Sequence, residues 1–167
     1  MRRMTNGLVA GVLAAGAAAT AGWTQISPGS EPFMVGSDEF ELIQQEGVQI
    51  WRGRAEETQG ENRLRAGEIR VYHDVQDGGF GQALRIEATG EVFFVTPEQV
   101  ARGDRAVYTA ATDTLVVTGD VILRQGENVL TGSSLSINIA TGRARMEGAP
   151  TGNAGRRVQG VFYPGQD

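Results

Sequence analysis

The chain has 167 residues, enough for one domain, with 15 arginines, no lysine, 20 acidic residues and a single histidine. It contains no cysteine, which excludes disulfides, thiolate metal sites and a lipid-modified cysteine anchor. The net charge of −5 argues against nucleic acid or an anionic membrane surface as a bulk partner.

Residues 1–21 are typical of an export signal. Arg2 and Arg3 form a charged start, residues 8–18 are apolar, and an Ala-Thr-Ala cleavage site ends at Ala21. The apolar stretch is shorter than the roughly 20 residues of a membrane-spanning helix. We therefore predict cleavage after Ala21, which leaves 13 basic and 20 acidic residues and a net charge of −7.

After residues 22–36, which contain two prolines and are predicted to be extended, a unit of about 29 residues repeats four times. The first and last spacings are 29 residues and the middle one is 37, for units that begin at Ser37, Ala66, Gly103 and Gly132. We place the additional residues in a loop between His73 and Gln82, around Asp77-Gly78-Gly79. A period in this range is typical of stacked supersecondary units, none of which buries its apolar face alone.

Within each unit, apolar and polar residues alternate with a period of two, as on a strand with one buried face. A turn and a second strand follow, and a third strand is predicted after the unit's glycine, as at Gly90 and Gly119. Short turns make neighbouring strands antiparallel. The sequence thus predicts an all-β domain over residues 37–163, whose last strand lies within residues 157–162, and a tail at residues 164–167.

No catalytic, metal or cofactor site is predicted. His73 has no catalytic or metal-binding motif around it. Asp38 and Asp104 occupy equivalent repeat positions, so their spacing reflects architecture and not an acid–base pair. An enzyme acting on an envelope polysaccharide remains an alternative; it predicts clustered carboxylates in an outer groove and loss of turnover when one is mutated.

The remaining candidate site is the apolar face of the strands. It is either an ordinary core, closed by side chains that meet across two sheets, or the lining of a lumen for apolar ligands. The predicted lumen residues are Phe40, Leu42, Ile69, Val71, Ile86, Val92, Phe94, Tyr108, Leu115, Val117, Val121, Leu123, Leu135, Ile137 and Ile139.

Several stretches resemble one known family. Residues 103–108 (Gly-Asp-Arg-Ala-Val-Tyr), residues 115–121 (Leu-Val-Val-Thr-Gly-Asp-Val) and the pair Gln125-Gly126 are similar to the periplasmic lipopolysaccharide-transport protein A (LptA) family of the OstA-like group. Residues 31–38 and 155–164 also look like the ends of that family. The resemblance covers nearly all of the chain after the export signal, and it lies in the order and length of a degenerate strand pattern.

The resemblance implies a folded-over antiparallel β-jelly roll with a V-shaped section, located in the periplasm and without enzymatic activity. Its apolar lumen would hold the lipid A acyl chains of lipopolysaccharide. Copies would stack head to tail through terminal strands and connect an LptC-like inner-membrane protein with an LptD-like outer-membrane protein. Strand addition at an exposed sheet edge is a known mode of recognition.

Two features depart from this picture. Ala55 and Glu57 stand where the third unit has Val121 and Leu123, which predicts a mouth or edge of the lumen there. The negative net charge gives no general attraction for phosphate, so we expect phosphate contacts from a few arginines in the first two units: Arg52, Arg54, Arg63, Arg65 and Arg70.

Two further alternatives stay open. One is a membrane-tethered LptC-like component of the same pathway, which would retain residues 1–21. The other is a structural linker of the envelope that polymerises through its ends and binds no lipid.

Overall fold

The computed structural model describes residues 34–76, 79–149 and 157–164. The predicted export signal with its cleavage site, residues 22–33 and the end of the tail at residues 165–167 lie outside this part of the chain. Most of the described residues belong to one antiparallel sheet, so the all-β prediction is confirmed. No helix in these ranges is long and apolar enough to cross a membrane.

The sheet contains ten strands in the described residues, together with two single-turn 3-10 helices, η1 (Gln44–Glu46) and η2 (Ala110–Thr112). It begins at Met34, inside the segment 22–36 that the sequence predicts only to be extended. In chain order the strands are β1 (Met34–Gly36), β2 (Glu39–Ile43), β3 (Val48–Gln59), β4 (Asn62–Gln76), β5 (Gly79–Val95), β6 (Gln99–Thr109), β7 (Thr114–Gln125), β8 (Asn128–Asn138), β9 (Arg143–Glu147) and β10 (Gln159–Val161).

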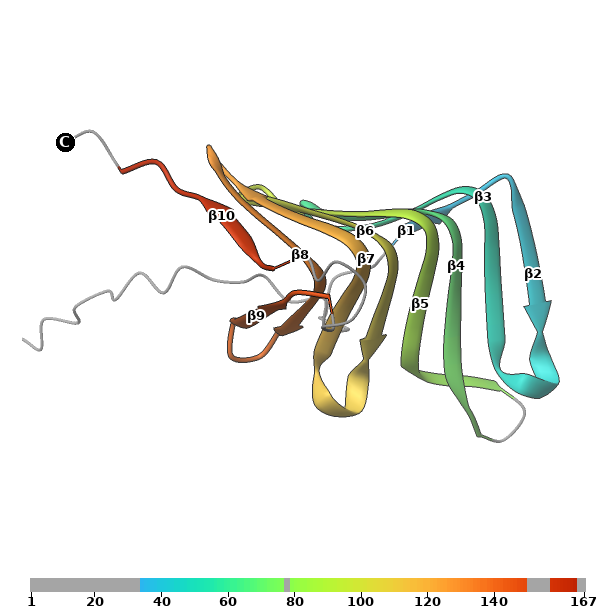
Figure 1. The fold of residues 1–167 in the computed structure, drawn as a ribbon. Coiled ribbons are helices and arrows are strands. Elements are labelled where there is room, and N and C mark those ends of the chain that lie inside the picture. Colours follow the sequence, from blue (N-terminus) through green and yellow to red (C-terminus); the bar gives the residue numbers. More distant parts are fainter. Residues whose placement is uncertain (1–33, 77–78, 150–156, 165–167) are drawn as a thin grey trace, which may run out of the picture.

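The sheet is folded over on itself, and each of the long strands β3 to β8 runs through both halves (Figure 1). We call the half that contains β2 and β9 leg A, and the half that contains β1 and β10 leg B. The fold line is marked by register shifts between Arg52 and Ala55, Arg65 and Glu68, Thr89 and Val92, Arg102 and Arg105, and Thr118 and Val121.

Such β-bulges bend strands without ending them. The prediction of a separate third strand after each unit glycine is therefore wrong. It is the continuation of the second strand beyond the bulge, as in β5 on either side of Gly90 and in β7 on either side of Gly119. Each of the strands β3 to β8 therefore contributes to both legs, and the two legs are joined at the fold line by continuous strands.

Close packing at the fold line explains two of the glycines. Gly53 and Gly119 have φ angles of 77° and 107°, a region that favours glycine. A Cβ on Gly53 would lie 2.6 Å from Oδ2 of Asp38, and a Cβ on Gly119 would overlap in the same way with Asp104. The two aspartates, which the sequence places at equivalent repeat positions, thus lie at equivalent corners of the sheet.

The additional residues of the second unit lengthen a hairpin instead of forming a loop. β4 and β5 remain paired as far as Gln76 and Gly79. His73 lies in this extension: its backbone N–H donates to the Gly47 carbonyl at 2.8 Å, and its ring packs edge-on against Phe80. The extension belongs to leg A, beyond the rows of side chains that form the core.

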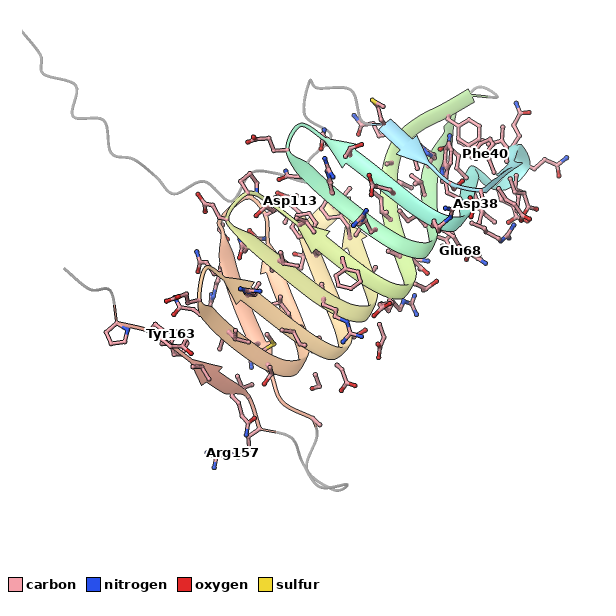
Figure 2. All side chains as sticks on the ribbon, turned by 90° about the horizontal axis from the view of Figure 1, so that it is seen from above. Asp38, Phe40, Glu68, Asp113, Arg157 and Tyr163 are labelled. Carbon is pink, nitrogen blue, oxygen red and sulfur yellow. The ribbon has the colours of Figure 1, made fainter. Side chains whose placement is uncertain are left out.

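The sheet is open at two opposite ends. In the described residues β1 and β2 pair only with β3, and β9 and β10 pair only with β8. Phe40 on β2 and Tyr163 beyond β10 therefore lie at opposite ends of the row of strands (Figure 2). Each end presents one edge strand per leg, and the core runs between the ends.

Candidate functional site: the lumen between the legs

On leg A, the inner side chains form two rows that cross the sheet, because directly paired residues of neighbouring strands share a face. The row nearer the fold line is Phe40, Trp51, Ile69, Ala88, Ala106, Val117, Leu135 and Met146. The row nearer the hairpin turns is Leu42, Gln49, Val71, Ile86, Tyr108, Leu115, Ile137 and Ala144. Both rows are apolar along most of their length.

Leg B contributes one complete row and a second set of small residues near the fold line. The row is Val35, Glu57, Leu64, Phe94, Ala101, Leu123, Leu130 and Gly160. Near the fold line, Ala55, Ala66, Val92 and Val121 are buried. Glu57 is the single titratable residue in the row, and it lies next to edge strand β1.

Side chains from both legs form a single hydrophobic cluster, whose buried members are at most 9% exposed. The lumen is therefore closed by side chains that pack across it. Of the two interpretations that the sequence leaves open, the packed core describes this state of the molecule. A ligand that enters between the legs has to displace these contacts.

Most of the predicted lumen residues lie in this cluster or against it. Ile86 packs against the cluster without being fully buried. Phe40 and Leu42 lie in the inner rows of leg A but are 51% and 45% exposed. Both lie on β2, which pairs only with β3 among the described residues, and the ring of Phe40 contacts the ring of Trp51 at 4.3 Å between centroids. Contact of any of these residues with lipid stays a prediction.

Several core residues are missing from the prediction. Ala55, Ala66, Ala88, Ala101 and Ala106 are buried, and so is Leu64. Alanine carries a weak hydrophobic signal, yet small side chains fit where the two legs come close at the fold line. Leu64 and Ala101 lie in the same row as Leu123 across the paired strands. The alternation of inner and outer residues along their strands would therefore have identified both.

Glu57 lies inside leg B with part of its carboxyl group sealed from water. Its Oε2 is buried and accepts no hydrogen bond. Burial raises the pKa of this carboxyl above its ordinary value, because desolvation disfavours the charged form. Of the two positions where the sequence predicts a mouth or edge of the lumen, Glu57 adjoins the edge strand β1, whereas Ala55 is fully buried at the fold line. A mouth at this end of the lumen stays a prediction.

Four of the five arginines expected to contact phosphate are engaged with carboxylates on the outer surface. Arg52 bridges Glu41 (2.6 Å) and Glu68 (2.9 Å), and Arg70 donates to the other oxygen of Glu68 at 2.5 Å. These ion pairs lower the pKa of Glu68, with the hydrogen bond from Arg70 as the largest cause. Arg52 and Arg70 are therefore already neutralised within the protein.

Arg54 and Arg65 are paired in the same way, with Asp38 and Glu56 at 2.5 Å each. The hydrogen bond from Arg54 is the main cause of the lowered pKa of Asp38. Arg63 differs from this group, because it is exposed and forms no ion pair with the described residues. It lies at the end of leg B beside Glu57 and Leu64, where these residues line a small cavity. Among the described residues, Arg63 is thus the one arginine of the five that forms no ion pair and is available to bind an anion.

The remaining polar residues do not assemble into a metal site. Within residues 34–76, 79–149 and 157–164, no three His, Asp or Glu side chains are grouped to hold an ion. His73 packs on Phe80 and its Nδ1 lies 3.2 Å from the Gly81 carbonyl oxygen. It acts as a structural residue of the hairpin extension.

These features define a class of folded-over β-sheet proteins with an apolar interior between two legs. Residues 34–143 match the sequence model of the family described as "LptA/(LptD N-terminal domain) LPS transport protein". The chain belongs to this lipopolysaccharide-transport family.

Two individual proteins extend this result. "Uncharacterized protein R00383" of Rhizobium meliloti (strain 1021) is 30% identical over 134 residues, which are 77% of this chain and 69% of that protein. The crystal structure of LptH from Pseudomonas aeruginosa, described as the LptA-homologous periplasmic component of the lipopolysaccharide transport device, superposes with a TM-score of 0.67 at 19% identity. The match covers 80% of this chain and 96% of LptH. The LptA-like β-jelly-roll fold is thereby confirmed.

Proposed function

We propose that this protein carries lipopolysaccharide through the periplasm with the lipid A acyl chains between the two legs. The observation that supports this most directly is the inner face, whose apolar rows run from one open end of the sheet to the other. The protein would connect an LptC-like partner at the inner membrane with an LptD-like partner at the outer membrane, without catalysing a reaction.

Acyl chains enter this lumen without specific polar contacts. Burial of each CH₂ group contributes about 0.8 kcal/mol, so several chains of a glycolipid are held strongly by apolar surface alone. Because the core side chains now pack against one another, the legs must separate to admit the chains. The energy of lipid burial offsets the loss of those contacts.

Photo-crosslinking on β8 tests the proposal. Ile137 is 2% exposed on the inner face, whereas its neighbour Ser136 belongs to the outer face and pairs with Arg145. A photo-reactive residue is placed at each position in turn, and lipopolysaccharide is added to the folded protein. We expect crosslinking at position 137 and none at 136.

Equal labelling at both positions would mean nonspecific adsorption and would contradict the proposal. Absence of labelling at both, in a protein that folds and self-associates, would favour the structural linker. Chain termini mapped on the purified protein distinguish the tethered component, which would retain residues 1–21.

We further propose that copies stack head to tail through their open ends. On leg A the edge strands β2 and β9 have five residues each, and on leg B β1 and β10 have three each. Strands alternate in direction from β2 to β9, so these two edge strands point in opposite directions. A second copy in the same orientation would therefore continue the antiparallel sheet on both legs.

Substitution on the edge tests this stacking. Leu42→Asp places a charge in the inner row of leg A, on edge strand β2, where β9 of a second copy would cover it. Leu84→Asp is the matched control, because Leu84 is 51% exposed and lies in β5, away from both edges. Light scattering should show loss of self-association in the first variant and none in the second. Equal self-association of the two variants would contradict the stacking proposal.

A further inference from the structure

The fold line of the second repeat unit lacks a side chain that the first and third units have. In the first unit Asp38 lies over Gly53, and a Cβ on that glycine would be 2.6 Å from Oδ2 of the aspartate. In the third unit Asp104 covers Gly119 in the same way. The residue at this position of the second unit is Gly67, which has no side chain to cover the fold line.

An open hollow of about 420 Å³ lies at this place. Its lining includes Gly67 and Gly90, whose backbones are so close that a Cβ on Gly90 would lie 3.2 Å from Cα of Gly67. Pockets that bind small molecules have volumes of about 300–1,000 Å³. The hollow is therefore large enough for a small organic molecule.

The hollow opens on the outer face of the sheet. Glu56, Arg65 and Phe93, which belong to its lining, are paired with one another across β3, β4 and β5. Each is a direct neighbour in the chain of a residue in the inner row of leg B, and successive side chains of a strand point to opposite faces. The strands thus separate the hollow from the lumen, and a lipid between the legs does not occupy it.

The charges in the lining balance, because it contains two arginines and two glutamates. They are Arg54, Arg65, Glu56 and Glu91. Arg65 and Glu56 pair with each other at 2.5 Å. Asp38 pairs with Arg54, and Arg102 pairs with Glu91. A charged ligand would have to compete with these ion pairs, whereas hydroxyl groups can use the donor and acceptor positions that the pairs leave open.

The backbone beside the hollow is strained. Arg54 and Glu91 have φ angles of 48° and 54°, in the left-handed region that residues with a side chain rarely adopt. Three non-glycine residues of the described chain have such a backbone, and two of them line the hollow. Strain of this kind is found mainly at functional sites, which supports a binding role for this place.

We propose that this hollow binds a saccharide, with its hydroxyl groups on the arginines and glutamates and the C–H face of a sugar ring on Phe93. An aromatic ring has a negative face that attracts C–H groups, and it is the apolar part of the lining. The ligand is a glycan separate from any glycolipid in the lumen, because continuous strands lie between the two sites.

Titration with chitotetraose, a neutral oligosaccharide of N-acetylglucosamine, tests the site. Its acetamido groups carry a donor and an acceptor in addition to the hydroxyl groups. Backbone amide resonances of the folded protein give both the affinity and the location of binding. We expect the resonances of Gly67 and Gly90 to shift, and that of Gly132 at the fourth unit to stay unchanged.

Two variants close or weaken the hollow. Gly67→Asp introduces the aspartate that the first and third units have. A Cβ there would lie 3.3 Å from the carbonyl oxygens of Thr89 and Gly90, so that a small adjustment accommodates it, and the φ angle of Gly67 is not positive. Phe93→Ala removes the aromatic ring.

Each variant has a matched control. Ser133→Asp adds the same charge at the same repeat position of the fourth unit, outside the hollow. Ile122→Ala shortens an apolar side chain in the same outer row as Phe93, two strands away. We expect Gly67→Asp to weaken binding more than about tenfold, because the new side chain fills the space. Phe93→Ala should weaken it about two- to tenfold, and the controls should bind as the wild type does.

Absence of binding to the wild type, or unchanged binding by folded Gly67→Asp, would overturn the proposal. Thermal unfolding checks the fold, and if Gly67→Asp is unfolded, unchanged binding by Phe93→Ala has the same meaning. Binding of the zwitterion alanylalanine in place of chitotetraose would overturn the choice of a saccharide.

Addition of lipopolysaccharide distinguishes this site from the lumen. We expect it to leave the affinity for chitotetraose unchanged, and competition between the two would contradict a separate glycan. Crosslinking at position 137 tests the lumen independently, so that failure of either proposal leaves the other standing.

Discussion

The hydroxyl group of Tyr108 donates a hydrogen bond of 2.8 Å to Oδ1 of Asp113. Tyr108 is buried in the inner row of leg A, and Asp113 closes the η2 turn with a φ angle of 46°. The backbone carbonyl of Asp113 also accepts a hydrogen bond from the N–H of Ile139. The pair therefore fixes the turn between β6 and β7 to the core and to the end of β8.

Removal of this hydroxyl group should destabilise the fold. We expect Tyr108→Phe to lower the free energy of unfolding by about 1 kcal/mol, the net contribution of a typical hydrogen bond. Tyr163→Phe is the control, because Tyr163 is 58% exposed and should show no change. Urea unfolding followed by circular dichroism measures both. Equal stability of wild type and Tyr108→Phe would mean that the bond contributes nothing.

Gly119→Ala should be among the most damaging single substitutions at the fold line. The new methyl group would overlap with Asp104 and occupy a backbone conformation that L residues avoid. Strain and overlap together should reduce the free energy of unfolding by about 2–4 kcal/mol. The double variant Asp104→Gly/Gly119→Ala removes the overlap and should recover part of the loss. Gly36→Ala meets no atom within 4 Å and serves as the control in the same urea titration.

The buried carboxyl of Glu57 should make stability depend on pH. Its folded-state pKa lies above the ordinary value of 4.5. Its contribution is therefore fully present below that pH and is lost as the pH rises through the folded-state pKa. We expect Glu57→Gln to match the wild type near pH 4 and to exceed it at neutral pH.

Asp38 and Glu68 act in the opposite direction, because their lowered pKa values make their contributions disappear at acid pH. Comparison of the variant with the wild type at each pH cancels these contributions. If the difference in urea midpoint between Glu57→Gln and the wild type stays constant from acid to neutral pH, Glu57 titrates in the folded protein as it does in the unfolded chain.

Phosphate recognition should depend on Arg63 more than on Arg52. Arg52 already satisfies Glu41 and Glu68, whereas Arg63 is exposed and free of ion pairs with the described residues. We expect Arg63→Ala to weaken binding of phosphorylated lipid A about two- to fivefold, as for one exposed charge pair, and Arg52→Ala to change it less. Dephosphorylated lipid A is the control ligand and should not distinguish the variants. A larger effect of Arg52→Ala would contradict this assignment.

The strand pattern and the apolar face were accessible from the sequence because they depend on local alternation. Leu115, Val117, Leu135 and Ile137 follow period two without interruption and are buried as predicted. The bends could not be predicted from the sequence, because a glycine such as Gly90 is equally compatible with a turn between two strands and with a β-bulge within one strand. The pairing of β5 with β4 and with β6 on both sides of Gly90 shows that the chain continues as one strand.

The ion pairs of individual charged residues could not be predicted from the sequence either. Arg52 and Arg70 look available in the sequence, yet they share Glu68 because β3 and β4 place the three side chains on one outer face. The exposure of Phe40 depends on the position of β2 at an edge, which strand order decides and alternation does not.

The aligned bulges at the fold line have a mechanical consequence. Because β3 to β8 all bend at this line and are hydrogen-bonded to one another, no strand can change its angle alone. We expect separation of the legs at one end of the sheet to change the bend of the neighbouring strands as well, because those strands are hydrogen-bonded to one another. We therefore expect the angle between the legs to change for all of these strands together, so that separation of the legs at either open end weakens their contact along the whole row of strands.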